Sequence, residues 1–383
     1  MRLKKLIVAG IGLALAASMT ACGTDTPPAQ TGSSGTDGPV VIDYSKDVGI
    51  VLSDASQPRW KMAEAQFLAA MPGAQVKFSN NEIAVEKTNV DSFIAAGVKV
   101  IIINSIDGPA AASEVEAAHT AGIPVIAYDR LIMNTANLPY YVTFDSVAVG
   151  RAQGKHLADA ATTPGSNLYI FAGDVGDNNA FLFFEGAWSQ LQPKIADGTF
   201  NVVNSPAAVK YKDQATLTRE QMNEIMSPLT TLWDPTRAKT LAEAALAGAS
   251  DAQKGTVYVL APNDQTSCSM TDAFRADKAV TQIYSTGQDL AKSSVQYILD
   301  GKQTMTVFKP DKFLVAQSKS LADSIIKGEK VDASLVVTTY NNGSIDVPST
   351  KAEITVVTKD NIEQVVNESG LYTITNGVVE DKK

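Results

Sequence analysis

The sequence has few of the residues that most enzyme active sites need. It contains two histidines and two cysteines in 383 residues, too few for a disulfide framework or a cluster of thiolate ligands. His119 and His156 each lie alone in a predicted helix, as surface residues do. The HExxH, CxxC, GxSxG and P-loop motifs, a strand followed by GxGxxG, and the calcium-binding loop are all missing. We therefore expect no metal, no cofactor and no enzymatic activity.

Positive charge is also scarce. The formal net charge is −9, and removal of the first 21 residues, which carry three positive and no negative charges, would lower it to −12. An acidic surface argues against nucleic acid as a partner and against binding to anionic lipids through a basic patch. Hydrophobic residues make up 45% of the chain, which is enough for a sizeable core in two domains.

The amino-terminal residues resemble an export signal. Residues 1–21 have a positively charged start, a short apolar run and small residues at the end, which predicts a secretory signal peptide. The sequence MTAC that ends at Cys22 resembles a bacterial lipobox, in which the cysteine becomes the lipidated first residue after cleavage. An ordinary signal peptide cut near Ala21 is the alternative. Residues 22–41 are rich in Gly, Ser, Thr and Pro, which predicts a flexible tether.

From about residue 40 the chain alternates short apolar runs with longer helical stretches. The runs, each followed by polar residues, include VGIVLSD, VKVIIINSIDG, GIPVIAYDR, NLYIFAGD, TVYVLAPND and TQIYSTGQD. Continuous apolar strands are buried on both faces, which indicates parallel strands covered by helices. Repeated βαβ units with right-handed crossovers form doubly wound sheets, and ligands bind outside the carboxyl ends of their strands. The sequence therefore predicts an α/β fold with one polar site.

Several segments resemble, in order, those of the periplasmic sugar-binding proteins of ABC importers, specifically the xylose-binding and multiple-monosaccharide-binding group. They include PRW at 58–60, INSIDG at 103–108, IAYDRLI at 126–132, GDNNAFLFF at 176–184, WDP at 233–235, PND at 262–264, STGQD at 285–289, TVFKP at 306–310 and TTYNNGSIDVPS at 338–349. The resemblance extends from about residue 48 to about residue 375.

The resemblance implies the type I periplasmic binding protein fold, in which two doubly wound parallel-sheet lobes are joined by three hinge crossings. The crossings would fall near Phe144, Thr306 and Asn341. The N-terminal lobe would then comprise residues 42–145 and 307–340, and the C-terminal lobe residues 146–306 and 341–378.

The resemblance also implies a monosaccharide site. The hydroxyl groups of a sugar need planar hydrogen-bonding partners, and its C–H faces stack on aromatic rings. The hydrogen-bonding residues would be Arg59, Asp129, Arg130, Asp177, Asn179, Asn263, Asp289 and Lys309, and the stacking residues Trp60, Trp233 and Phe183.

Alternatives remain open for several of these residues. Arg59 and Arg130 could be surface ion-pair partners, Trp60 could belong to the core, and Asp177 could merely cap a helix. Asp264 could contact the sugar in place of Asn263. Residues 206–232 form a longer segment than the resemblance leads us to expect, and QMNEIM within it predicts a helix that reshapes the pocket mouth or decorates the surface.

We therefore expect a monomeric, extracytoplasmic receptor, anchored to the membrane by a lipid on Cys22. It would deliver an aldopentose or aldohexose, such as xylose, glucose, galactose or arabinose, to an ABC permease whose ATPase is a separate chain. One alternative is a sugar receptor that presents its closed form to a chemoreceptor or sensor kinase. Another is a secreted sugar isomerase, or a glycosidase with Asp177 and Asp289 as its carboxylate pair. Which monosaccharide binds is not determined by the sequence.

Overall fold

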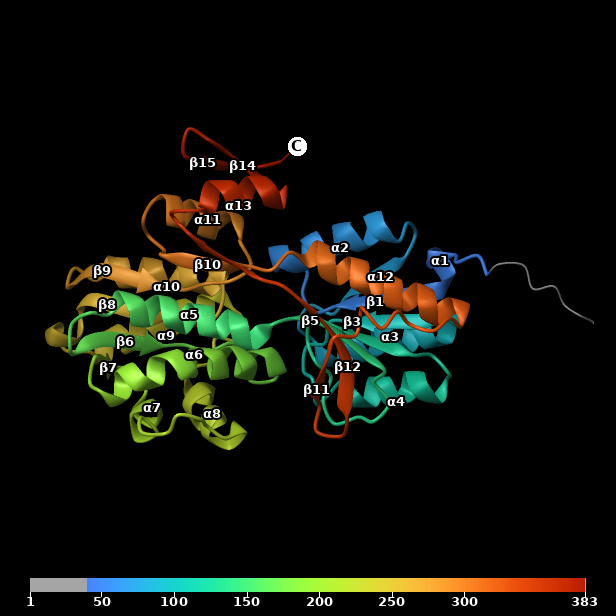
Figure 1. The fold of residues 1–383 in the computed structure, drawn as a ribbon, viewed down its shortest axis with the longest axis horizontal. Coiled ribbons are helices and arrows are strands. Elements are labelled where there is room, and N and C mark those ends of the chain that lie inside the picture. Colours follow the sequence, from blue (N-terminus) through green and yellow to red (C-terminus); the bar gives the residue numbers. More distant parts are fainter. Residues whose placement is uncertain (1–39, 383) are drawn as a thin grey trace, which may run out of the picture. The chain divides into compact units, whose positions relative to one another are not determined.

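The computed structural model describes residues 40–382, most of which form two α/β lobes (Figure 1). The predicted signal peptide, the lipidation site Cys22 and all but the last two residues of the predicted tether lie outside the described residues. No helix between residues 40 and 382 is long and apolar enough to cross a membrane. The same residues contain no group of three or more His, Cys, Asp or Glu side chains placed to hold a metal ion.

The N-terminal lobe is built on a seven-stranded sheet with the order β11-β12-β5-β4-β3-β1-β2. Its strands are β1 (Val48–Leu52), β2 (Gln75–Phe78), β3 (Val100–Ile103), β4 (Val125–Tyr128), β5 (Tyr140–Phe144), β11 (Thr338–Asn341) and β12 (Asp346–Ala352). Its helices are α1 (Tyr44–Asp47), α2 (Pro58–Ala70), α3 (Ile83–Ala96), α4 (Ala112–Thr120) and α12 (Asp311–Lys327). The β11–β12 pair is antiparallel, and the other pairs are parallel.

Helices cover both faces of this sheet because its central strands are apolar throughout. On β1, Ile50 packs in a core cluster with α2 and α12, whereas its neighbour Val51 packs in a second cluster with α3 and α4. Helices α2 and α12 lie side by side on the first face (Figure 1). The predicted double-sided burial is therefore confirmed for this lobe.

The C-terminal lobe contains a parallel four-stranded sheet with the order β7-β6-β8-β9. Its strands are β6 (Ser166–Ile170), β7 (Phe200–Val202), β8 (Gly255–Leu260) and β9 (Val280–Ser285). Helices α5 (Ser146–Ala160) and α6 (Asn178–Ala196) pack on one face, and α9 (Pro235–Gly248) and α10 (Asp264–Ala276) on the other. The α5–α6 crossing is close because Gly150 and Gly186 have no Cβ: a Cβ on either would lie within 2.1 Å of a carbonyl oxygen of the other helix.

Smaller elements complete the C-terminal part of the chain. They are α7 (Pro206–Lys210), α8 (Arg219–Met226), η1 (Ser227–Leu229), η2 (Asp251–Gln253), α11 (Lys292–Leu299), β10 (Met305–Phe308), β13 (Thr355–Thr358), α13 (Ile362–Ser369), β14 (Tyr372–Thr375) and β15 (Val378–Asp381). Strands β10 and β13 pair with each other, and so do β14 and β15. The helix predicted from QMNEIM is present as α8. Trp188 lies in the core of this lobe with 2% of its surface exposed.

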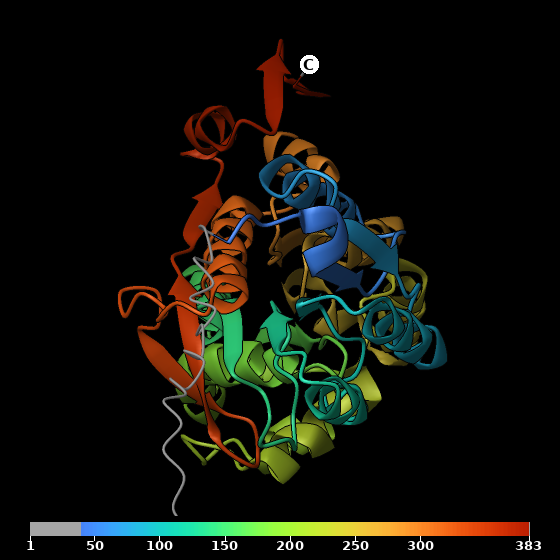
Figure 2. The ribbon, with the colours of Figure 1, turned by 90° about the vertical axis from the view of Figure 1, so that its right-hand side faces the viewer.

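Three chain segments join the lobes. The first connects Phe144 to Ser146, and the second follows β10 and leads into α12. The prediction for the third was wrong. It assigned residues 341–352 to the C-terminal lobe, but β12 pairs with β5 in the N-terminal sheet. The chain crosses between β12 and β13 and then continues to α13 (red in Figure 2).

The physical reason is that the Asn-Gly pair after Asn341 belongs to a β-hairpin. Asn342 and Gly343 lie in the loop between β11 and β12, where an Asn-Gly pair is a common turn signal. The side-chain amide of Asn342 donates to the backbone carbonyls of Ile132 (3.2 Å) and Thr135 (2.8 Å), which fixes the hairpin to the N-terminal lobe.

The two histidines differ in their exposure to solvent. His119 is exposed, as predicted. His156 is half-buried, and its Nε2 lies 2.9 Å from Thr304 Oγ1, so the predicted surface position is wrong for this residue.

Candidate functional site

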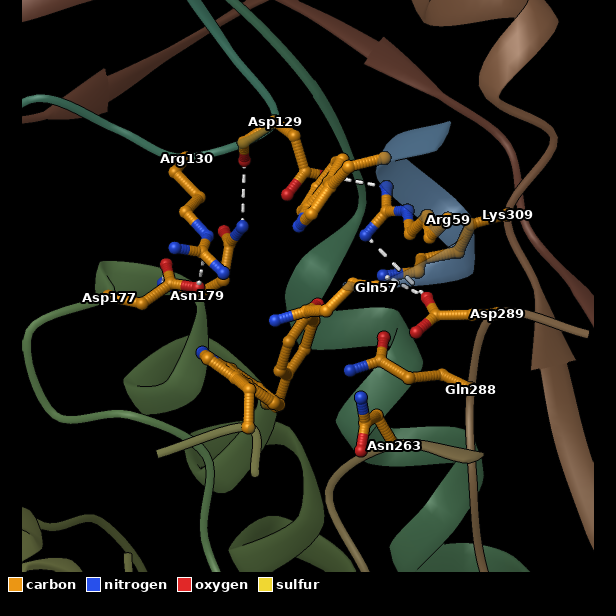
Figure 3. A pocket seen from close by; sticks show the side chains of 13 residues that line it. Gln57, Arg59, Asp129, Arg130, Asp177, Asn179, Asn263, Gln288, Asp289 and Lys309 are labelled. Carbon is orange, nitrogen blue, oxygen red and sulfur yellow. Dashed lines mark hydrogen bonds and ion pairs between the residues drawn. The ribbon is translucent and has the colours of Figure 1, made fainter. Parts of the chain in front are cut away.

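A pocket lies between the two lobes at the carboxyl ends of the strands (Figure 3). Its lining residues are Gln57, Arg59, Trp60, Asp129, Arg130, Asp177, Asn179, Phe183, Trp233, Asn263, Gln288, Asp289 and Lys309. All eleven predicted site residues are therefore brought together, and Gln57 and Gln288 were missed. The empty space within this lining, open solvent included, is about 310 Å³. Contact of these side chains with a ligand stays a prediction.

Arg59 is the centre of a buried ion cluster on the N-terminal side of the pocket. Its guanidinium pairs with Asp129, lies 3.1 Å from Asp311 Oδ1, and lies 3.6 Å from Asp289 Oδ1. Burial acts against its positive charge, but the three carboxylates outweigh burial and raise its pKa. Burial acts to raise the pKa of Asp129, but the positive charges of Arg59, Lys309 and Arg130 together outweigh burial and lower it. Arg59 thus lines the pocket with 11% of its side chain exposed, and is not a surface ion-pair partner.

Arg130 and Asp177 join the lobes across the pocket. Arg130 Nε lies 3.2 Å from Asp177 Oδ2, and both side chains are buried. Burial raises the pKa of Asp177 to about 6, although the positive charge of Arg130 acts in the opposite direction. Asp177 also accepts a hydrogen bond from Asn179 N (2.9 Å) and so caps α6. Asp177 therefore caps α6 and also lines the pocket.

A second contact between the lobes runs through Asn179. Its Nδ2 donates to the backbone carbonyl of Asp129 (2.7 Å), as Figure 3 shows, and its Oδ1 accepts from Tyr141 and Ser146, at 3.1 Å each. The backbone N–H of Gly108 donates to the carbonyl of Gly176 (3.1 Å) nearby. These bonds hold the two lobes together on one side of the pocket.

The aromatic residues line the pocket from both lobes. Trp60 and Trp233 are 2% and 7% exposed, and the ring of Phe183 meets that of Trp233 edge to face at 6.3 Å. Trp60 also packs in the N-terminal core, which agrees with the alternative core interpretation; stacking on a sugar stays a prediction. Among the described residues, Trp60 Nε1, Trp233 Nε1 and Gln288 Oε1 are buried without a hydrogen-bond partner. Buried polar atoms are rarely left unpaired, so these atoms suit a polar ligand.

Three of the predicted site residues have a strained backbone. Asp129, Trp233 and Asp289 have φ values of 63°, 58° and 105°, in the region that favours glycine. Such conformations cluster at functional sites, where the surrounding structure holds them. Here Asp129 N donates to Val142 O (2.7 Å) and Asp289 N to Val307 O (2.8 Å).

Asn263 and Asp264 differ in their position relative to the pocket. Asn263 lines the pocket. Asp264 lies outside the lining and accepts hydrogen bonds from Thr306 Oγ1 (2.7 Å), Gln303 Nε2 (3.2 Å) and Ala291 N (2.8 Å). Burial raises its pKa to about 7.

Sequence reasoning missed three residues of this region. Gln288 lies inside the STGQD motif and Gln57 directly precedes PRW, so their motifs could have pointed to them. Asp311 pairs with Arg59 from behind the lining, and neither its position nor its residue type signals this role.

Comparison with known proteins agrees with this geometry. The family model described as periplasmic binding protein domain matches residues 48–330. The chain is 31% identical to the multiple sugar-binding periplasmic receptor of Rhizobium radiobacter, over 85% of this chain and 90% of that protein. It is 30% identical to the D-xylose-binding periplasmic protein of Haemophilus influenzae, over 86% of this chain and 92% of that protein.

A solved structure resembles the whole described region. It is a carbohydrate transporter solute binding protein from Chloroflexus aurantiacus in complex with D-glucose, with 49% identity and a TM-score of 0.83, covering 86% of this chain and 98% of that chain. The expected fold, two α/β lobes with parallel sheets, is confirmed. The chain belongs to the periplasmic binding protein family.

Proposed function

We propose that this protein is an extracytoplasmic receptor that binds one monosaccharide and delivers it to an ABC importer. The observation that carries the proposal is the pocket itself. Charged and amide side chains from both lobes line it together with two tryptophans. The hydroxyl groups of a sugar would hydrogen-bond to the charged and amide side chains, and its C–H faces would stack on the tryptophan rings.

The position of the pocket favours a single sugar ring over an oligosaccharide. Both lobes contribute lining residues, so a ligand would be held between two facing surfaces. D-Glucose and β-D-glucose are bound in two solved structures that are 49% and 29% identical to this chain. We propose an aldohexose or aldopentose, with glucose and xylose as the first candidates.

The lobes would close on the sugar by a hinge motion. Arg130 with Asp177, and Asn179 with the backbone of Asp129, connect opposite lobes. A sugar that hydrogen-bonds to residues of both lobes binds the closed form more tightly and shifts the population toward it. The three connecting segments would bend while each lobe moves as a unit.

The lipid anchor and the membrane partner are further parts of the proposal. The sequence around Cys22 supports lipid attachment, which would hold the receptor near a permease whose ATPase is another chain. The alternative, in which a chemoreceptor or sensor kinase reads the closed form, uses the same site. Uptake of labelled sugar by a strain without this protein separates the two, because a receptor for an importer is needed for uptake and a pure sensor is not.

A sugar panel tests the core of the proposal. Thermal unfolding is measured with simple pentoses and hexoses, because a ligand that binds the folded state alone raises the midpoint by mass action. We expect at least one free monosaccharide to raise the midpoint and to bind with a Kd of about 1 µM or tighter by calorimetry, with no product formed after long incubation. Tight binding of a hexasaccharide and none of monosaccharides would contradict the proposal.

A further inference from the structure

Residues 206–232, the segment that is longer than expected, contact the loop that carries Asp177. This segment connects β7 to α9 and contains α7 and α8. At its end, Thr230 Oγ1 donates to Gly173 O (2.7 Å) and Thr231 Oγ1 to Ala172 O (2.9 Å). The backbone of the segment that follows β6 is thereby bonded to the residues just before Trp233.

A second contact is made by Arg219, the first residue of α8. Its guanidinium lies 3.7 Å from the ring centroid of Phe181, and its Nη1 donates to Asn178 Oδ1 at 2.5 Å. Asn178 and Phe181 both lie in the first turn of α6, whose N-cap is Asp177. Arg219 therefore contacts the helical turn that determines the positions of Asp177 and Asn179.

Arg219 would stay beside the α6 turn if the lobes separated. Arg130 pairs with Asp177 from the opposite lobe, so a hinge opening would remove it, whereas Arg219 belongs to the same lobe and would stay. Burial lowers the pKa of Arg219, and the negative charge of Asp177 acts against that shift. The other charged groups that face Asp177 are the carboxylates of Asp174 and Asp129.

From these contacts we infer that Arg219 is a positioning residue for the sugar site. By holding the first turn of α6 through Asn178 and Phe181, it keeps Asp177 and Asn179 in place before the lobes close. This inference rests on the proposed function and gives the longer segment a role in sugar affinity.

Calorimetry with D-glucose and D-xylose tests the inference in the purified protein. Loss of a charged hydrogen-bond donor in Arg219→Ala should weaken binding about tenfold. Arg219→Lys should recover most of the affinity, because an ammonium can still donate to Asn178 and lie over Phe181. The matched control is Lys210→Ala in the same segment, where an exposed lysine pairs with Glu224 (2.8 Å). This control should bind as the wild type does.

Two readouts distinguish positioning from a purely structural role. The first is rescue of sugar affinity by Arg219→Lys, because a lysine keeps the cation that contacts Asn178 and Phe181. The second is a double variant: combining Arg219→Ala with Asn178→Ala should cost no more affinity than Arg219→Ala alone, because that change already removes the contact with Asn178.

The outcomes are separable. If the wild type binds a sugar and Arg219→Ala binds it equally well, the inference is wrong and the proposed function stands. A lower unfolding midpoint with unchanged affinity overturns it too. If the wild type binds neither these sugars nor any other of the panel, the proposed function fails and the inference with it.

Discussion

The indole ring of Trp233 lies directly against the backbone of Gly173. A Cβ placed on Gly173 would be 2.1 Å from a carbon of that ring, far inside van der Waals contact. Gly173 has no positive φ that would demand glycine, so the close approach of the ring is what requires it. The absence of a side chain on Gly173 therefore determines the position of the Trp233 ring in the pocket lining.

Gly173→Ala should therefore weaken sugar binding while leaving the fold intact. The indole must move away from the new methyl group, and loss of an aromatic anchor typically costs about 2 kcal/mol or more of binding free energy. Calorimetry with D-glucose measures the loss. Gly248→Ala is the control, because a Cβ there meets nothing within 4 Å. Equal affinity of Gly173→Ala and wild type would show that Trp233 does not contact the sugar.

Asp289 should contribute to both affinity and stability. Its Oδ1 lies 3.0 Å from Lys309 Nζ, and the Lys309 side chain is 3% exposed. Asp289→Ala should weaken sugar binding by about 2–4 kcal/mol and destabilise the sugar-free protein by about 1–3 kcal/mol, because the ammonium is left buried without this partner. The double variant Asp289→Ala/Lys309→Met should regain stability but not affinity. Unchanged affinity of the single variant would remove Asp289 from the site.

Most of the site could be predicted because its residues follow strands or lie in ordered motifs. Asp129, Asp177 and Asp289 each come after an apolar strand, and parallel strands bring their carboxyl ends to one edge of a sheet. Asp311 could not be found this way, because it acts through Arg59 and does not line the pocket.

The position of the third crossing could not be predicted, for a different reason. Pairing of β12 with β5 joins Ser349 to Tyr141, residues far apart in sequence, and no local pattern reports such a pairing. The exposure along β12 alternates only weakly, and its Pro348 and four hydroxyl or charged residues resemble a loop more than a strand.

Two buried carboxyl groups should make folding stability depend on pH. Glu86 on α3 and Glu114 on α4 are 1% and 2% exposed. Burial raises the pKa of Glu86 to about 7 and that of Glu114 to about 8, and the charge of Glu86 adds to the shift of Glu114. Both bind a proton more tightly in the folded than in the unfolded protein. Stability should therefore fall as pH rises from about 4.5 through about 8.

Chemical denaturation at pH 5, 7 and 9 checks this dependence. Glu86→Gln/Glu114→Gln should lose less stability than the wild type over that range, by roughly 2–4 kcal/mol, since a neutral amide has no ionisation cost. The backbone N–H of Ile106, which Glu86 Oε2 accepts at 2.9 Å, can still be paired by the glutamine oxygen. Glu82→Gln, an exposed control next to α3, should follow the wild type. Parallel curves for wild type and double variant would contradict the prediction.

The three tryptophans should respond differently to sugar. Trp60 and Trp233 line the pocket from opposite lobes, whereas Trp188 stacks on Phe184 and donates its Nε1–H to Gln214 O (2.9 Å) in the C-terminal core. Sugar should change the fluorescence of the first two and leave that of Trp188 nearly unchanged.

Replacing each tryptophan with alanine separates binding from stability. Trp233→Ala should cost roughly 2–4 kcal/mol of affinity with little loss of fold. Trp60→Ala should cost affinity and stability together, because the ring also packs in the N-terminal core. Trp188→Ala should destabilise by about 3–5 kcal/mol, as large core truncations do, while the molecules that remain folded still bind. Unfolding midpoints and sugar-induced quenching of each variant decide among these outcomes. If Trp188→Ala alone abolished quenching, the pocket between the lobes would not be the sugar site.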